Sequence, residues 1–357
     1  MWYNEWVKKS SDNQTKSKIM FDIIAIGDAT IDTFLMIHDI EIERRGGKLK
    51  AVINWGDKLP VDEFYRTVAG NAANNAVGSA KLGMRTAFYT VLAHDVGGRE
   101  IIHKMQKEGV STRYIVIDER HGTNASTVLS YDGERTIFVY HEHRTYKLPN
   151  FAHSSWAYLT SMANGFSDIY KDLAKYIDRY EVKLGFNPGT FQLRAGIKAN
   201  KIILERTELL SLNVEEAQSW VGDCGRDPEE LCLKLRKLGP KSVVLTDGRK
   251  GAYSHSDEGF YYIPEFPGKR VEATGAGDGF TTAYMAALFH GKSHQEALAW
   301  GPVNAGSVVL HVGPQAGLLS RHEIEKRLKK MKSYRAVEIK DEKTKRYILK
   351  SAAQKQD

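Results

Sequence analysis

Residues 270–292 read RVEATGAGDGFTTAYMAALFHGK, in which three glycines and an aspartate stand directly before a helix-like run. A tight turn with a helix cap accounts for one glycine and for Asp278, because glycine adopts backbone angles that other residues avoid and aspartate is a favoured cap. It does not account for the consecutive small residues Gly275, Ala276 and Gly277. Small residues leave backbone N–H groups uncovered and a helix start adds partial positive charge, so the stretch predicts an anion site. A carboxylate inside such a site suits a base that takes a proton from a hydroxyl attacking phosphorus, so we predict phosphoryl transfer.

Two common phosphate-binding loops do not fit this stretch. A Walker A loop has the pattern GxxxxGK[ST], and no lysine follows these glycines. The dinucleotide-binding fingerprint is GxGxxG, whereas the glycines here follow the pattern GxGxG. The anion site is therefore of another kind.

The composition is that of an ordinary globular chain. Its 357 residues are 42% hydrophobic and 27% charged, which predicts one large domain or one domain with an inserted lobe. No run approaches the roughly eighteen consecutive apolar residues of a membrane span, and the first residues lack the order of a signal peptide. Cys224 and Cys232 lie close together in a helix-like segment, which indicates neither a disulfide framework nor a metal site. We expect a cytoplasmic protein without a membrane partner.

Both ends of the chain differ in character from its middle. The first apolar strand pattern begins just after Met20, which suggests a start at Met20 and a disordered, dispensable extension over residues 1–19. The net charge is +7, and residues 321–357 hold 13 Lys and Arg against 6 Asp and Glu, so this segment carries the whole excess. A Lys-rich terminal helix and tail is typically a solvated face, which argues against nucleic acid as a partner.

Strand patterns alternate with helix patterns between the two ends. The stretches FDIIAIGDATID, RTAFYTVLAHDVGG and KSVVLTDGRKGAYSH each read as an apolar strand followed by a glycine turn. This alternation predicts a parallel sheet covered on both faces, with ligands at the carboxyl ends of its strands. The residues that follow these strands are Gly27-Asp28, Asp95, Asn187, Asn213 and Asp247-Gly248.

Two segments depart from this alternation of strands and helices, and they predict a small separate sheet. Residues 33–66 lack a helix pattern, and residues 121–143 read as a hairpin with Asp132-Gly133 at its turn. Two strand-rich insertions of this kind can form a lid over the strand ends.

Several separated motifs together resemble the ribokinase-like, or PfkB, family of small-molecule kinases over roughly residues 20–320. They occur in the family's order and are GDATID, TVAGNAANNAVGSAKLG, LSLNVEEAQSW, VVLTDGRKGAY, EATGAGDGF and HVGPQAG. The resemblance implies an α/β fold: a ribokinase-like three-layer α/β/α sandwich with a mostly parallel central sheet and a small β-sheet lid. It divides the chain into the extension 1–19, a kinase domain 20–320 with a lid from about 33–66 and 121–143, and a basic C-terminal helix and tail over 321–357.

The resemblance also implies roles for individual residues. Asp278 corresponds to the family's general base, and the backbone of Gly275, Ala276 and Gly277 to its anion hole. The residues expected to contact the phosphate acceptor are Asp32, Gly70, Asn71 and Asn74. Taken alone, Asn and Gly at a helix start are also ordinary capping residues.

A second set of residues is implied to bind ATP and its ions. Asn213 and Glu216 resemble the family's NxxE motif, with Glu216 holding Mg²⁺ through water, although the same pair fits a capping box. Thr246 and Gly248 match the turn that touches phosphate and ribose. Glu272 and Thr274 match a monovalent-cation site for which K⁺ is the candidate, with Glu272 where many members carry Asp.

The sequence leaves the identity of the phosphate acceptor open. We expect an ATP-dependent carbohydrate kinase of the ribokinase or fructokinase type, and the aromatic insertion LKAVINWGDKLPVDEFY keeps a nucleoside kinase as the alternative. A non-catalytic sugar- or nucleotide-binding regulator that uses the basic tail is disfavoured because Asp278 and the anion hole are intact. The lid allows a homodimer. Lid residues that could contact the acceptor, or only pack the lid, are Tyr65, Tyr140, His141, His143 and Arg144.

Overall fold

The computed structural model describes residues 21–46, 48–131, 134–222 and 226–353. Three sequence predictions lie outside these residues: the extension 1–19 with its alternative start at Met20, the Asp132-Gly133 turn, and Cys224. Cys232 is a free, buried cysteine.

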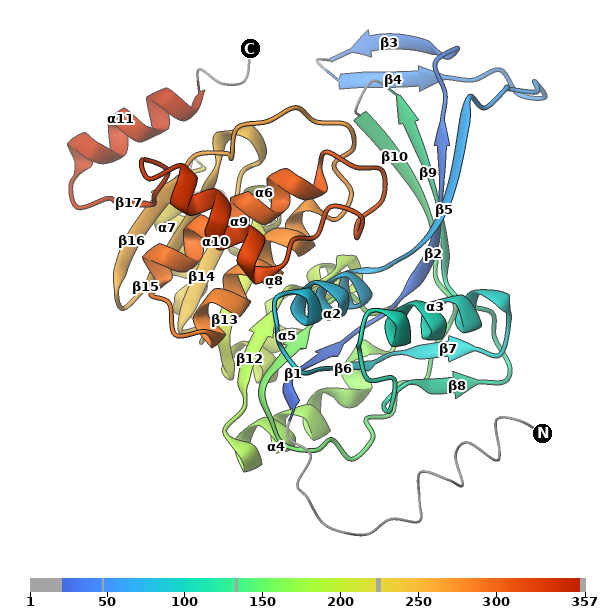
Figure 1. The fold of residues 1–357 in the computed structure, drawn as a ribbon, viewed down its shortest axis with the longest axis horizontal. Helices are drawn as coiled ribbons and strands as arrows, with labels where there is room; N and C mark the ends of the chain where they lie inside the picture. The colour runs from blue at the N-terminus through green and yellow to red at the C-terminus, as the bar shows by residue number, and fades with distance from the viewer. Residues whose placement is uncertain (1–20, 47, 132–133, 223–225, 354–357) are drawn as a thin grey trace.

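A large mixed sheet forms the centre of the molecule (Figure 1). Among the described residues it has nine strands, in the order β17-β16-β15-β14-β13-β12-β11-β1-β6. The six strands from β14 to β6 are parallel, and the other three are antiparallel, which confirms the expected mostly parallel sheet. Their bounds are β1 Phe21–Ile26, β6 Thr86–Tyr89, β11 Ser154–Leu159, β12 Lys183–Phe186, β13 Thr207–Asn213, β14 Ser242–Thr246, β15 Ala252–Ser256, β16 Gly259–Ile263 and β17 Val337–Glu338.

Helices cover both faces of this sheet and complete the three-layer sandwich (Figure 1). One face carries α2 Asn71–Lys81, α8 Ala276–Phe289, α9 His294–Val308 and α10 Arg321–Lys330. The other carries α4 Tyr170–Tyr180 with the 3₁₀ turn η1 Phe166–Ile169, α5 Thr190–Leu204, α6 Val214–Val221 and α7 Pro228–Arg236.

Strand β1 explains why two cores form. All six of its residues are buried, and successive side chains point to opposite faces of the sheet. Ile24 and Ile26 enter the core beneath α4 to α7, whereas Ile23 packs with α8 and α9. A strand with apolar residues on both faces needs cover on both sides, which the alternating helices supply.

The predicted lid is a second sheet of four strands that projects from the strand ends (Figure 1). Its order is β10-β9-β2-β5, and we call these strands the lid: β2 Thr30–Met36, β5 Glu63–Ala69, β9 Ala125–Tyr131 and β10 Glu134–Tyr140. A hairpin of β3 Glu41–Arg45 and β4 Lys48–Val52 is inserted between β2 and β5. A parallel pair, β7 Val91–Ala93 and β8 Val116–Asp118, lies beside α3 Val96–Lys107.

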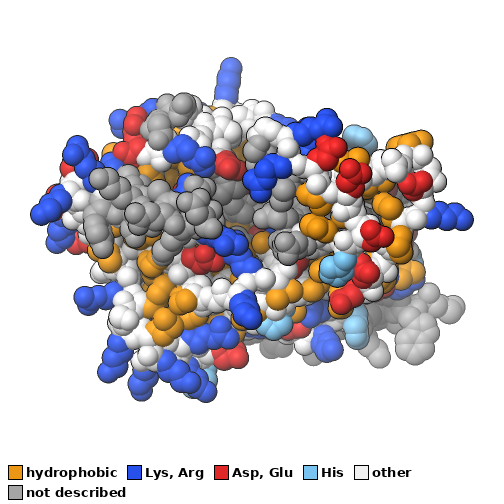
Figure 2. Space-filling model, turned by 90° about the horizontal axis from the view of Figure 1, so that it is seen from above, with side chains coloured by type: hydrophobic (Ala, Val, Ile, Leu, Met, Phe, Trp, Pro, Cys, Tyr) orange, Lys and Arg blue, Asp and Glu red, His pale blue; other side chains and the backbone are white. Residues whose placement is uncertain are grey.

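The C-terminal segment is less solvated than its charge indicated. After α10, β17 adds to the edge of the main sheet, and α11 Glu342–Ala353 follows it. Ile324, Ile339 and Ile348 are buried in the two main cores. The segment is therefore a solvated face only in part, because a few apolar residues spaced among the lysines dock it to the cores. Lys and Arg side chains still gather at this end of the molecule (Figure 2).

No helix in the described ranges is both long and apolar enough to cross a membrane. The cytoplasmic location stays a prediction, as does the absence of a nucleic-acid partner.

Candidate active site

The glycine-rich stretch forms the start of α8. Gly275 is the N-cap, with φ of 80°, in the left-handed region that favours glycine. A Cβ there would lie 2.4 Å from Cβ of Pro314, so the close approach of this loop also requires glycine. At Gly277, by contrast, a Cβ would meet nothing within 4 Å beyond the adjoining backbone of its own helix. The first turn of a helix leaves N–H groups without intrahelical partners, so the open side at Gly277 is suited to an anion.

Asp278 lies in the first turn of α8 and is buried. Its Oδ1 accepts a hydrogen bond from Nδ2 of Asn71 at 3.0 Å, and its Oδ2 accepts one from Nδ2 of Asn74 at 2.8 Å. Burial raises the pKa of Asp278 to about 6, against the lowering effect of these two bonds. Each carboxylate oxygen has a second lone pair, so the group can still accept a proton.

Helix α2 carries both asparagines that bind Asp278. Gly70 is its N-cap, with φ of 97°, and a Cβ there would lie 2.7 Å from the carbonyl oxygen of Asp28. Asn71 and Asn74 are three residues apart and therefore share one face of the helix. Gln315 Nε2 donates to Oδ1 of Asn74 at 3.0 Å, which fixes the orientation of that amide.

The polar cavity beside Asp278 is lined by half of the site residues chosen from the sequence, and Asp32, Gly70 and Asn74 are not among its lining residues. Asn213 ends β13, Thr246 ends β14, and Glu216 is on α6. The residues that line this cavity are Asn71, Arg135, Asn187, Ser211, Leu212, Asn213, Glu216, Thr246, Ala273, Gly275, Gly277, Asp278 and Thr281.

The pair Asn213 and Glu216 has the capping-box geometry that the sequence allowed. Asn213 Oδ1 accepts from Glu216 N at 2.8 Å, and Glu216 Oε2 accepts from Asn213 N at 2.9 Å. Burial raises the pKa of Glu216, and the negative charge of Asp278 raises it further. The cap therefore holds a carboxylate at the wall of the polar cavity. Among the described residues no cluster of three or more His, Cys, Asp or Glu could hold a metal ion by itself.

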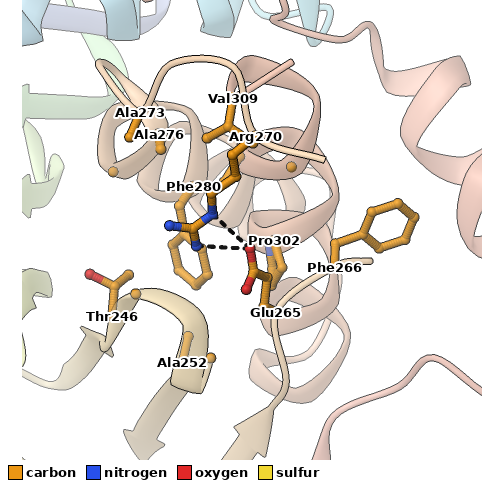
Figure 3. Close-up of a pocket in the computed structure, with 15 residues that line it drawn as sticks. Thr246, Ala252, Glu265, Phe266, Arg270, Ala273, Ala276, Phe280, Pro302 and Val309 are labelled. Atoms are coloured by element: carbon orange, nitrogen blue, oxygen red, sulfur yellow. Dashed lines mark hydrogen bonds and ion pairs between the residues drawn. The ribbon is translucent and has the colours of Figure 1, made fainter. Parts of the chain in front are cut away.

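An apolar cavity adjoins the polar one and shares Thr246, Ala273 and Gly277 with it. Gly248 and Ala276 also line it. Figure 3 shows Phe280, Pro302 and Val309 on one side and Thr246 and Ala252 at the strand ends opposite. Arg270 reaches across to Glu265, whose Oε1 accepts bonds of 3.0 Å and 2.8 Å from Nε and Nη2 (Figure 3).

The predicted cation-site residues contact each other. Glu272 Oε1 accepts bonds from Thr274 N at 2.8 Å and from Thr274 Oγ1 at 2.6 Å. Glu272 is almost wholly buried, and no hydrogen-bond partner of its Oε2 lies among the described residues. Arg135 Nε lies 3.7 Å from Oε1.

Arg135 is the residue of this site that the sequence reasoning missed. It lies on the lid strand β10, yet it lines the polar cavity with Asp278. Alternation along β10 puts one set of side chains on the site face, but the alternation alone does not say which set. Asn187, which the sequence marks only as a residue that follows a strand, also lines the cavity.

Asp32 lies on the site face of the lid. It pairs with Thr67 on β5 and Ser126 on β9, and its Oδ1 accepts a bond from Thr30 Oγ1 at 2.6 Å. Burial raises the pKa of Asp32, and the negative charge of Glu272 adds to the rise.

Other candidates have local roles. Arg144 is buried and donates to Asp118 at 2.8 Å, which ties the chain after β10 to the end of β8. Asp28 accepts bonds from Tyr146 at 2.8 and 2.9 Å, and Asp95 caps α3 through Gly98 N at 2.7 Å. Asp28 and Asp95 are therefore strand-end residues that do not line either cavity.

The sequence matches the family model described as pfkB family carbohydrate kinase over residues 47–321. The chain belongs to the PfkB family of carbohydrate kinases. It is therefore a phosphotransferase with an alcohol group as acceptor, as the motifs predicted.

Similar proteins agree with this membership. The chain is 26% identical over 328 residues to the 5-dehydro-2-deoxygluconokinase of Bacillus subtilis, which covers 85% of this chain and 95% of the relative. The structure of Arabidopsis thaliana ribokinase complexed with ribose and ATP superposes with a TM-score of 0.72 at 22% identity, covering 87% of this chain and 99% of that one. The nucleoside kinase of Methanocaldococcus jannaschii gives a TM-score of 0.69 at 19% identity, covering 86% and 98%. The likeness to these two structures concerns the fold.

Proposed function

We propose that this PfkB-family kinase transfers the γ-phosphate of ATP to a hydroxyl group of a small sugar, with Asp278 as the general base. The observation that carries this proposal is the position of Asp278. Its two oxygens are held by Asn71 and Asn74, and it lies where the helix start meets the polar cavity. A carboxylate fixed beside an anion-binding backbone can take the proton of the attacking hydroxyl.

The surrounding residues suit the remaining parts of the reaction. Asp32 would hold acceptor hydroxyls from the lid, beside Gly70 and the two asparagines of α2. The N–H groups of the Gly275-Ala276-Gly277 turn would stabilise the charge on the transferring phosphoryl group. The backbone at these positions is preorganised, because the left-handed Gly275 fixes the turn before any substrate binds.

The nucleotide fits the two adjoining cavities. Its base would enter the apolar cavity between Phe280 and the end of β14, and its phosphates would run past Thr246 and Gly248 towards Gly277. Mg²⁺ neutralises charge on the β- and γ-phosphates in such reactions. Mg²⁺ is usually held by one or two carboxylates together with phosphates and water, and Glu216 at the cavity wall offers such a carboxylate.

A monovalent cation such as K⁺ fits beside Glu272. The support is the buried Oε2 without a hydrogen-bond partner in the described part of the chain. A buried carboxylate oxygen without a partner is costly, and a bound cation would remove that cost.

The raised pKa of Asp278 predicts the pH dependence of the reaction. The base works only when deprotonated, and its pKa in the free protein is about 6, so kcat/KM should be constant above that pH and fall about tenfold per unit below it. A pH profile of kcat/KM would measure this. A carboxylate with an ordinary pKa near 4 would instead keep full activity down to about pH 5, and that result would contradict the proposal.

Arg135, which lies on the lid, should assist the phosphoryl transfer. Arg135→Gln removes the positive charge that lines the polar cavity, and we expect kcat to fall about tenfold, or about 1.4 kcal/mol. Steady-state kinetics would measure it. Arg66→Gln is the matched control, because Arg66 lies on the other face of the lid and pairs with Glu100 at 2.8 Å. Equal kcat values for the two variants would exclude Arg135 from the transfer step.

A coupled ATP-consumption assay identifies the acceptor. The panel should hold ribose, fructose, 5-dehydro-2-deoxygluconate, adenosine and inosine, which represent sugars, a sugar acid and nucleosides. We expect turnover with a sugar or sugar acid, in line with the relative of that class. Turnover with nucleosides alone would select the alternative, a nucleoside kinase.

The lid also supports the homodimer that the sequence allowed. Phe64, Phe138 and Tyr140 lie on the face of the lid opposite Asp32, and each is more than half exposed. β5 and β10, which carry them, are the two edge strands of the lid. Such an apolar face on a sheet with two open edges suits pairing with a second copy.

A further inference from the structure

Residues 331–353 follow the region matched by the family model, and they pack against β16 and residues 248–250, beside the proposed nucleotide site. We call them the C-terminal clasp. Strand β17 of the clasp pairs Val337 with Tyr262 of β16, and Ile339 N donates to Phe260 O at 2.8 Å. The clasp therefore forms the outer edge of the main sheet, at the end of the molecule where α11 lies (Figure 1).

A first route leads from β17 to the proposed nucleotide turn. Tyr262, whose backbone pairs with β17, donates its hydroxyl to Lys250 O at 2.9 Å. Lys250 ends the 3₁₀ turn η2 Gly248–Lys250, and α11 lies against that turn. Pairing with β17 thus holds β16 in place, and Tyr262 of β16 holds η2 through its hydroxyl group.

A second route leads from Lys345 on α11. Lys345 is buried, and its Nζ lies 2.6 Å from Asp227 Oδ2 and 2.8 Å from Glu229 Oε2. A third carboxylate, that of Glu342, lies 3.8 Å away. Removing the charge of Lys345 would leave the neighbouring carboxylates of Asp227 and Glu229 without their shared cation, so this contact holds α11 and the start of α7 together.

Asp227 connects the Lys345 contact to Arg226 and Asp247. It caps α7, and its Oδ1 accepts from Glu229 N at 2.9 Å. The residue before it, Arg226, has φ of 60°, a left-handed conformation that a non-glycine residue keeps only when its neighbours hold it. Arg226 Nη2 in turn lies 4.0 Å from Asp247 Oδ1.

Both routes end on the same recess. Arg226, Asp247, Gly248 and Lys250 line it together with Asn213 and Thr246, which also line the polar cavity. We propose that the C-terminal clasp positions this recess for the phosphates of the nucleotide, with Lys345 as the positioning residue. The proposal rests on the nucleotide site proposed above and adds to it a segment beyond the matched region.

The test compares two substitutions on one helix. Lys345→Met keeps the length of the side chain and removes its charge, whereas Lys343→Met changes an exposed lysine of the same helix. Calorimetric titration of the full-length protein with the ATP analogue AMP-PNP and Mg²⁺ needs no acceptor. We expect Lys345→Met to weaken binding about tenfold and Lys343→Met to leave it unchanged within twofold. Lys345→Arg should restore most of the affinity.

The two measurements distinguish a clasp that positions the phosphate recess from a clasp that only stabilises the fold. A lower melting temperature for Lys345→Met with unchanged AMP-PNP affinity would refute the clasp's role. Tyr262→Phe interrupts the other route without removing a charge and should also weaken AMP-PNP binding, so it tests the proposal if Lys345→Met does not fold. Wild-type protein that fails to bind AMP-PNP would refute the proposed nucleotide site itself, and with it the clasp's role there.

Discussion

Asp278→Asn is expected to lower kcat by about 10²–10⁴-fold, the usual range for the loss of a general base. Asparagine has the same size but cannot take a proton from the acceptor. It also keeps one carbonyl oxygen, so one of the two bonds from Asn71 and Asn74 is retained. The lost bond is offset because a buried charge is removed as well, so we expect little change in melting temperature. Turnover is measured in the coupled assay, and AMP-PNP affinity should stay within a few fold.

Asp28→Asn is the matched control for this variant. Asp28 is also buried, and burial raises its pKa to about 6, as it does for Asp278. Its carboxylate instead accepts bonds from Tyr146 and from Ala163 N, and it lines neither cavity. By the same reasoning we expect Asp28→Asn to change the melting temperature little, because an amide oxygen can keep the bonds from Tyr146 and Ala163 N, and to leave kcat near that of the wild type. If Asp278→Asn kept wild-type turnover, Asp278 would be only a structural residue of the helix start.

The fold could be predicted from the sequence because its main signals are local. Strand β1 is a run of buried residues, and helix patterns follow the strands, so a covered parallel sheet was expected and was found. The lid followed from the absence of helix patterns in two insertions. What these local signals could not give is the register of the lid strands, because strand pairing depends on contacts between residues far apart in the chain.

The site was predictable to the extent that it is built from contiguous motifs. The Gly275–Asp278 turn and the start of α2 each supply several groups at fixed spacing, and Asn71, Asn74 and Asp278 do meet in the structure. Arg135 was missed because it reaches the site only through the register of β10.

The C-terminal segment was misread for a different reason. Its lysines dominate the composition, and charge alone predicted a solvated face. Among its described side chains, Ile339 and Ile348 pack into the core, and Lys345 docks through carboxylates that lie more than a hundred residues earlier. A buried lysine with distant partners has no local sequence signal.

The second large effect is expected at the anion site. Gly277→Val should lower kcat by about 10²–10³-fold, the range for losing one preorganised donor to a developing oxyanion. The side chain of valine would project into open space at the start of α8 and cover the N–H groups that face the polar cavity. Because Gly277 is helical and its position is open, the substitution should lower the melting temperature only slightly, and Gly277→Ala should have an intermediate effect on kcat.

Gly275→Ala gives the contrast that makes this result interpretable. Gly275 has φ of 80°, and a Cβ there would lie 2.7 Å from Cα of Pro314, so even a methyl group forces the loop apart. We expect its main effect on the melting temperature, measured by thermal unfolding, with activity lost as the turn distorts. Gly277→Val should instead lower kcat while the melting temperature stays close to that of the wild type. Near wild-type kcat in Gly277→Val would mean that the phosphoryl group does not pass the start of α8, and the mechanism would then need a different anion site.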